Sequence, residues 1–233
     1  PHVIEEYRLS MTAASAFQYA TMLGIATGAL LLGFLADRFG RQRTIILGLS
    51  LYGLSSLLVA LGGHFPALVA MLALSGLGIS VFKTAALALI GDITSSPQAH
   101  TRFMNHVEGW FAVGAIVGPA IVAASLTAGV SWKWLYVVAA AICFALVVMA
   151  SRVPNPAPRI SVERASLAQM LAVMRDPLAL GFSLLVALYV GVEVAIYTWM
   201  PTYLKDYAGP HTWWPAWALT AFFALRAAGR FLG

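Results

Sequence analysis

The sequence has few charged residues and a single cysteine. Charged residues make up 10% of the chain and hydrophobic residues 61%, whereas a soluble domain usually has about a quarter of its residues charged. Cys143 lies alone in an apolar run, which excludes a disulfide framework and the paired spacing of a zinc site. Neither an H-E-x-x-H helix nor paired aspartates of the kind used in intramembrane catalysis occur. The composition therefore predicts a membrane protein, with no metal or cofactor and no sign of an enzyme.

What the sequence does have is long apolar runs. About 20 apolar residues are enough for a helix to cross a bilayer. Seven runs approach or exceed this length, the last of them incomplete, at about residues 11–36, 43–62, 66–90, 104–127, 132–150, 178–200 and 212–233. The predicted fold is an all-α, multi-span helical bundle in the inner or plasma membrane, with the lipid bilayer as its surroundings.

Most of the basic residues lie in the connectors that flank these runs. The net charge of +5 fits the positive-inside bias of membrane proteins better than it fits binding to nucleic acid. Connectors on one side hold Arg38, Arg41, Arg43, Arg102, Arg152, Arg159, Arg164 and Arg175. Connectors on the other side hold Arg8, Lys133 and Lys205. This asymmetry places the first set in the cytoplasm, and the first run then passes from outside to inside.

The longest connector covers residues 151–177 and contains Pro154, Pro156 and Pro158. It predicts a division into residues 1–150, the connector itself and residues 178–233. Within the connector, apolar residues recur at helical spacing at Leu167, Met170, Leu171 and Met174. They indicate either an amphipathic helix on the membrane surface or a loop helix packed on the spans.

The connector after the first run, residues 33–43, reads Gly-Phe-Leu-Ala-Asp-Arg-Phe-Gly-Arg-Gln-Arg. Gly33 allows neighbouring helices to approach closely, and Gly40 permits a sharp turn. Asp37, at a helix end, can accept from helix N-terminal amides or pair with an arginine. Such contacts would hold the cytoplasmic side shut in one state and break in another. The alternative is a basic topology signal with an incidental aspartate.

This segment resembles the signature loop of the major facilitator superfamily, G-x-x-x-D-R-x-G-R-[KR]. It differs from that pattern at Gln42. The resemblance implies a gating motif at Gly33, Asp37, Arg38, Gly40, Arg41 and Arg43, with Arg230 in the equivalent motif of the second half. The seven runs then resemble helices two to eight of a twelve-helix transporter. Such a protein would carry a small solute by alternating access, with a proton as a candidate coupled ion.

Two further segments are similar to the fucose, glucose and galactose:proton symporters. One contains Asn105 and His106, and the other extends from Tyr189 past Glu193 to Trp199. However, Lys83 stands where those symporters tend to have a glutamate, which leaves an organic anion as well as a sugar open as the solute.

A third segment, with Gly114, Gly118 and Pro119, partly resembles the antiporter motif of drug exporters. Its physical meaning is close packing and a helix kink. A drug or metabolite exporter and a receptor that no longer transports remain alternatives.

Charged residues within the spans need a reason, because each costs about 2.5–3.5 kcal/mol at the bilayer centre on insertion scales. Lys83 either pairs with Glu108, or faces a central cavity and binds an anionic group or replaces a coupled ion. Glu193 faces the cavity or is a helix-packing acid. Arg226 lines the cavity or supports the motif that contains Arg230.

Two other side chains, His106 and Trp199, are also candidates. His106 is either a proton relay or a packing residue. Trp199 belongs to an interfacial aromatic belt or stacks on the solute.

Overall fold

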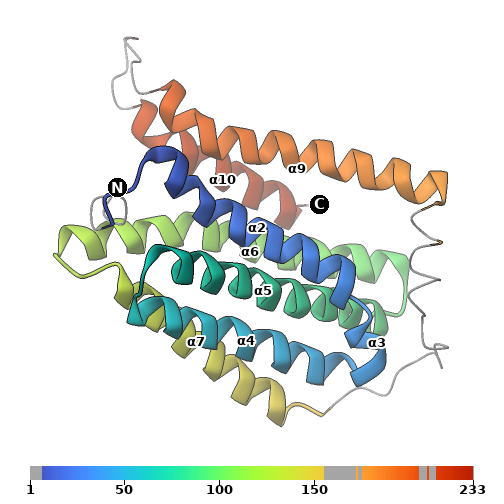
Figure 1. Ribbon diagram of the computed structural model, residues 1–233. Coiled ribbons are helices and arrows are strands. Elements are labelled where there is room, and N and C mark those ends of the chain that lie inside the picture. The colour runs from blue at the N-terminus through green and yellow to red at the C-terminus, as the bar shows by residue number, and fades with distance from the viewer. Residues whose placement is uncertain (1–6, 155–171, 173–174, 205–208, 210–213, 233) are drawn as a thin grey trace. The chain divides into compact units, whose positions relative to one another are not determined.

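The computed structural model describes residues 7–154, 172, 175–204, 209 and 214–232. All seven predicted runs are helices, shown in Figure 1, which confirms the all-α fold. The long helices are α2 (Met11–Leu32), α4 (Arg41–Leu61), α5 (Phe65–Ile93), α6 (Pro97–Thr127), α7 (Lys133–Arg152), α9 (Pro177–Tyr203) and α10 (Trp214–Leu232). The predicted helix around Leu167, Met170, Leu171 and Met174 lies outside the described residues.

Two helix boundaries differ from the apolar runs. The first run, predicted as continuous to residue 36, breaks after Leu32, and a five-residue helix, α3 (Leu35–Phe39), follows. The helix α6 begins at Pro97, seven positions before its apolar run, because the polar residues ahead of the run are helical too. A run of apolar residues marks the part of a helix that lipid surrounds, so it misses helical residues outside the bilayer.

Five helices of the described chain are long and apolar enough to cross a membrane, namely α2, α4, α5, α7 and α9. The helices α6 and α10 are of comparable length, but they carry charges at Arg102, Glu108, Arg226 and Arg230. Two of these charges, Glu108 and Arg226, pair with each other.

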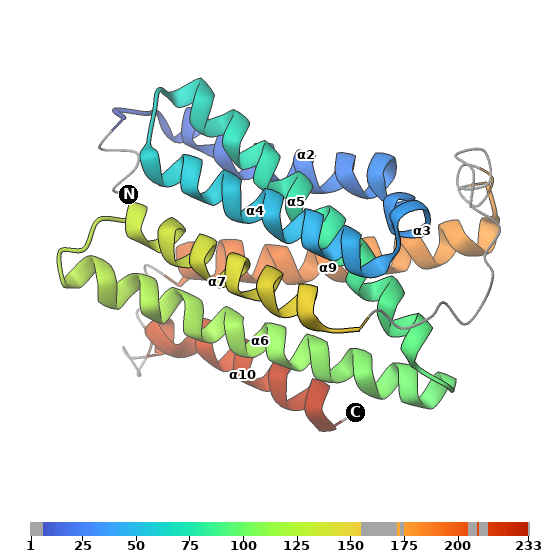
Figure 2. The ribbon, with the colours of Figure 1, turned by 90° about the horizontal axis from the view of Figure 1, so that it is seen from below.

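The chain forms two compact units, residues 1–95 with 122–165 and residues 96–121 with 166–233. The first unit contains α2 to α5, the end of α6, and α7. In it α5 contacts both α2 and α4, and α4 also contacts α7, as Figures 1 and 2 show. The second unit contains the first part of α6 together with α9 and α10.

Small residues let the helices of the first unit approach closely. A Cβ added at Gly48 of α4 would lie 2.4 Å from the backbone nitrogen of Phe82 on α5. A Cβ at Gly24 of α2 would lie 2.1 Å from the carbonyl oxygen of Ala73, also on α5. Backbone contact of this kind is how membrane helices associate when there is no water to drive apolar surfaces together.

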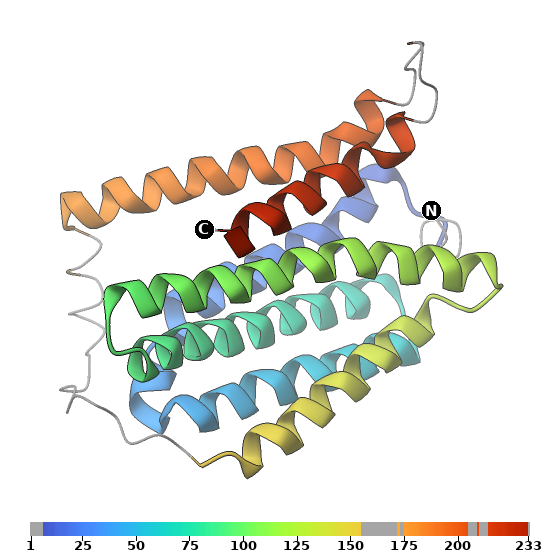
Figure 3. The ribbon, with the colours of Figure 1, turned by 180° about the vertical axis from the view of Figure 1, so that it is seen from behind.

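In the second unit a glycine also allows close contact between two helices. A Cβ at Gly109 of α6 would lie 2.7 Å from the ring of Phe231 on α10. The helix α10 also contacts α9, beside which it runs in Figure 3. By contrast, Gly114 and Gly118 have open space where a Cβ would be, and α6 continues unbroken past Pro119. The close packing and the kink proposed there remain predictions.

Candidate functional site

The turn between α3 and α4 is fixed by backbone and side-chain contacts. Gly40 has φ of +88°, in the region that favours glycine, which agrees with the expected sharp turn. Thr44, on the first turn of α4, is almost fully buried. Its hydroxyl contacts the carbonyl oxygens of Leu35 at 3.1 Å and Gly40 at 2.9 Å. These contacts tie the first turn of α4, which begins at Arg41, to the residues before it.

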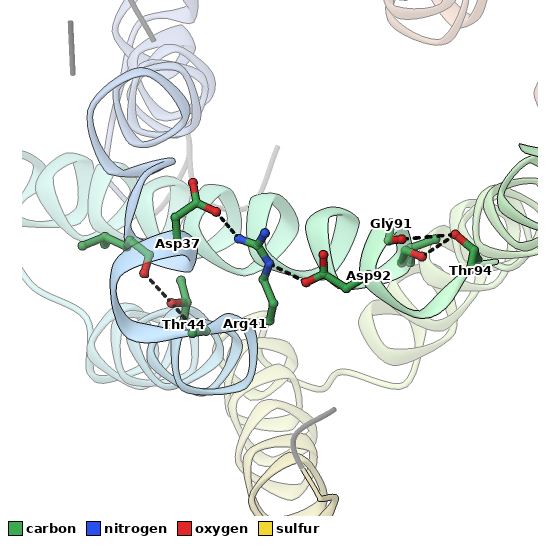
Figure 4. A network of polar contacts seen from close by, with 9 residues as sticks. Asp37, Arg41, Thr44, Gly91, Asp92 and Thr94 are labelled. Carbon is green, nitrogen blue, oxygen red and sulfur yellow. Dashed lines mark hydrogen bonds and ion pairs between the residues drawn. The ribbon is translucent and has the colours of Figure 1, made fainter. Parts of the chain in front are cut away.

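Arg41 lies between two aspartates, and we call Asp37, Arg41 and Asp92 the Arg41 cluster (Figure 4). Its Nε donates to Oδ2 of Asp92, at the end of α5, across 2.9 Å, and its Nη1 pairs with Asp37 on α3. The side chain of Arg41 is 18% exposed, and each aspartate is 27% exposed. Three consecutive helices are therefore joined by one guanidinium.

Asp92 was not predicted as a site residue. The signal was present, because Asp92 is a lone acid at the end of an apolar run, on the side of the membrane where the basic connectors lie. The other motif arginines behave differently from Arg41. Arg38 and Arg43 are exposed, and the guanidinium carbon of Arg38 lies 5.7 Å from the centre of the Phe39 ring. Gly33, the residue after the last of α2, has helical backbone angles, and its role in close helix packing stays a prediction.

A second cluster lies within the other unit. We call Glu108, Glu193 and Arg226 the Arg226 cluster, and each residue comes from a different helix. Nη2 of Arg226 donates to Oε2 of Glu108 across 3.3 Å, and Nη1 lies 3.0 Å from Oε1 of Glu193. The guanidinium carbon also lies 5.5 Å from the centre of the Phe111 ring. One arginine thus ties α6, α9 and α10 together.

The Arg226 cluster shows the partners of three charged residues that were candidates within the spans, namely Glu108, Glu193 and Arg226. Glu108, whose side chain is 27% exposed, has an ion pair, but its partner is Arg226. Lys83 is exposed on α5 of the first unit. A pair between Lys83 and Glu108 would join the two units, so it stays a prediction. Glu193, predicted to face a cavity or to pack, is paired and only 13% exposed at its side chain.

The remaining candidates surround this cluster or lie on the surface. Nη2 of Arg230 donates to the hydroxyl of Tyr189 on α9 across 3.3 Å. His106 bonds through Nδ1 to the carbonyl oxygen of Arg102 at 2.8 Å, and its ring meets the Phe231 ring edge-on. Asn105 is half-buried, and Trp199 is exposed. Among the described residues no three potential ligands gather to hold a metal ion.

Comparison with known proteins decides the family. The model of the Major Facilitator Superfamily matches residues 1–233. The chain belongs to this superfamily. It is a multi-pass membrane protein, as the family and the apolar helices show together.

The relatives that the chain resembles are transporters of different kinds. It is 35% identical over 115 residues to the 3-(3-hydroxy-phenyl)propionate transporter of Escherichia coli K12, which covers 49% of this chain and 27% of that protein. It is 29% identical over 164 residues to the multidrug efflux pump LfrA of Mycolicibacterium smegmatis, covering 68% of this chain and 32% of LfrA. Multidrug resistance protein 2 of Bacillus subtilis is 35% identical over 83 residues, covering 36% and 20%. The chain spans about a third or less of the length of these relatives.

Proposed function

We propose that this chain is part of a secondary transporter that carries a small solute across the membrane by alternating access. The observation that carries this proposal is the Arg41 cluster. It joins the ends of α3, α4 and α5 through partly exposed ion pairs, which a change in helix position can break and re-form at small energetic cost. The relatives are named as transporters and pumps, and no enzymatic activity is proposed.

The solute class that fits best is a small organic anion. Arg226 places a nearly buried guanidinium within the second unit, and Arg is suited to bind a carboxylate. Lys83 adds an exposed cation on a span. The Escherichia coli relative is named for a phenylpropionate, which is a carboxylate anion at neutral pH. We further propose a proton as the coupled ion, since import of an anion against a negative interior needs a driving force.

Two other solute classes remain candidates. The segments around Asn105 and Tyr189 support the fucose, glucose and galactose:proton symporter branch, although Lys83 departs from it. The relatives named as a multidrug resistance protein and a multidrug efflux pump support export of drugs. The relative named as a phenylpropionate transporter has a similar identity to this chain and supports a different solute.

Uptake by the intact protein in proteoliposomes distinguishes these classes. Three labelled solutes are offered, 3-phenylpropionate, galactose and ethidium, with and without an imposed proton gradient. We expect 3-phenylpropionate to accumulate when the outside is acidic, and Arg41→Gln to slow that accumulation. Accumulation of galactose alone would favour the sugar branch, and proton-driven movement of ethidium alone would favour export. Movement of none of the three would contradict the proposal of an organic anion carrier.

A further inference from the structure

Two arginines of the first unit are exposed and lie outside the Arg41 cluster. Arg43 is on the first turn of α4, and Arg152 is the last residue of α7. Neither has an ion pair among the residues that the structure describes. An exposed arginine without an ion pair keeps its guanidinium donors available for a group outside the chain. We call these two residues the Arg43 surface.

The helix ends that carry the Arg43 surface are joined by Gln42. Its Nε2 donates to the carbonyl oxygens of Ala150 and Val153, each across 2.6 Å. Gln42 directly precedes Arg43, and the two carbonyl groups lie on either side of Arg152 in the chain. The helices α4 and α7 contact each other, and the start of one meets the end of the other. The two arginines therefore lie on adjoining helix ends.

The charge at this end of the first unit is positive. Arg38, on α3, is a third exposed arginine there. The two acids, Asp37 and Asp92, are both paired with Arg41. Among the described residues of this end, four arginines and two aspartates give a net formal charge of +2. A negatively charged group is therefore attracted, and a guanidinium can bind a phosphate through two parallel hydrogen bonds.

An exposed apolar face of α4 begins one turn after Arg43. Leu47 is four positions further along, and Leu54 and Leu61 follow at intervals of seven. Such spacing places them on the same face of the helix as Arg43, and each leucine is at least 50% exposed. On α7, the exposed Met149 lies one turn before the arginine of that helix. A cation at a helix end, followed by an exposed apolar face, fits the two parts of a phospholipid, its phosphate and its acyl chains.

We propose that the Arg43 surface binds the phosphate of an anionic phospholipid in the cytoplasmic leaflet, with an acyl chain lying along Leu47 and Leu54. The arginine-rich connectors predict that this end faces the cytoplasm, and the cytoplasmic leaflet carries anionic lipids. A soluble phosphate would contact the arginines and leave the leucines without a role. A zwitterionic lipid would bring a cation of its own next to a surface that is already positive. The proposed site uses no residue of the Arg226 cluster and does not depend on which solute is carried.

The test is a titration of the intact purified protein in detergent with phosphatidylglycerol or phosphatidylcholine of identical acyl chains, followed by native mass spectrometry. We expect phosphatidylglycerol to bind more tightly. The double variant Arg43→Gln, Arg152→Gln should weaken its binding about 25-fold, since each surface arginine adds an attraction of about fivefold. Binding of phosphatidylcholine should not change. The matched control, Arg8→Gln with Arg175→Gln, removes two exposed arginines elsewhere and should bind phosphatidylglycerol as wild type does.

A second measurement on wild type does not depend on the variants folding. Phosphatidylglycerol with a photoreactive diazirine in its acyl chain is incorporated into proteoliposomes, and peptide mass spectrometry locates the crosslinks. They should concentrate on α4 between Leu47 and Leu54 and be fewer on the exposed face of α9. An excess of unlabelled phosphatidylglycerol should remove them, and the same excess of phosphatidylcholine should not.

Four results would overturn the proposal. They are equal binding of the two lipids, unchanged binding of phosphatidylglycerol in a folded double variant, an equal loss of binding in the control variant, and crosslinks spread evenly over the exposed helices. Displacement of phosphatidylglycerol by millimolar inorganic phosphate would also contradict it, because the surface would then be a site for a soluble anion.

Discussion

The side-chain amide of Gln42 lies 2.6 Å from the main-chain carbonyl oxygen of Ala150, which is 108 positions further along the chain. The same amide nitrogen lies 2.6 Å from the carbonyl oxygen of Val153. The last carbonyls of a helix have no partner within it, so Gln42 at the start of α4 caps the end of α7. The residue by which this chain departs from the superfamily loop therefore has a structural role of its own.

Replacing Gln42 tests this cap. Gln42→Ala should lower the free energy of unfolding by about 1–2 kcal/mol, because two hydrogen bonds to the end of α7 are lost. Gln42→Arg should be close to wild type, since a guanidinium can donate to the same carbonyls and matches the superfamily pattern. Thermal unfolding of the intact protein in detergent measures both. Equal stability of the alanine variant and wild type would show that the cap contributes nothing.

The Arg41 cluster gives a prediction about rate. Asp37→Asn should preserve expression and slow transport several-fold or more, because a contact that forms and breaks in each cycle is weakened. Asp92→Asn should have a similar effect. Since both aspartates share Arg41, the double variant should be less impaired than the product of the two single effects.

Initial rates of uptake, normalised to the protein in the membrane, measure these three variants. Glu163→Gln, in the connector between α7 and α9, is the control and should transport at the wild-type rate. Unchanged rates in both aspartate variants would reduce the motif to a topology signal.

The close approach of α4 and α5 predicts a stability effect. Gly48→Ala places a methyl group 2.4 Å from the backbone of Phe82, and relieving such overlap typically costs about 1–3 kcal/mol. Gly181→Ala on α9 meets no atom within 4 Å and should be neutral or slightly stabilising, because alanine is the better helix former. Unfolding temperatures in detergent compare the two. A Gly48→Ala protein as stable as Gly181→Ala would show that α4 and α5 can move apart without loss of stability.

The sequence predicts the helices well and the contacts between them poorly. Seven apolar runs became seven helices because lipid demands a helix wherever the chain is apolar for about 20 residues. The partner of Glu108 could not be found this way. Arg226 is 118 positions away, and the pairing depends on how each helix is rotated about its axis. Counting residues gives depth along a helix, which made Lys83 a reasonable candidate, but it does not give that rotation. The sequence marks Asp92 as a lone acid at the end of an apolar run, but it does not show that Asp92 pairs with Arg41.

Topology is testable with single cysteines in a Cys143→Ala background. The structure improves the choice of positions, because Arg41 holds two aspartates while Arg43 is exposed. Cysteines at Arg43 and Arg159 should react with a membrane-impermeant maleimide only from the cytoplasm, and one at Lys205 only from outside. Labelling of all three from one side would contradict the assignment of spans.

The last prediction separates the two cations that were candidates within the spans. Arg226→Met leaves Glu108 and Glu193 without their guanidinium, and breaking a buried ion pair in this way costs about 3–5 kcal/mol. The triple change Arg226→Met, Glu108→Gln and Glu193→Gln removes the stranded charges and should recover most of that stability. Lys83→Met should leave the unfolding temperature close to wild type, because Lys83 is exposed on α5 and methionine keeps much of its length.

Uptake then shows what each cation does. If Lys83 binds the solute or replaces a coupled ion, Lys83→Met is stable and inactive. The rescued triple variant is also expected to be stable and inactive, because the anion has lost Arg226. A Lys83→Met protein that is unstable, and that Glu108→Gln rescues, would instead support the pair between Lys83 and Glu108. Full activity of Lys83→Met would leave Arg226 as the cation of the two on which recognition of the anion depends.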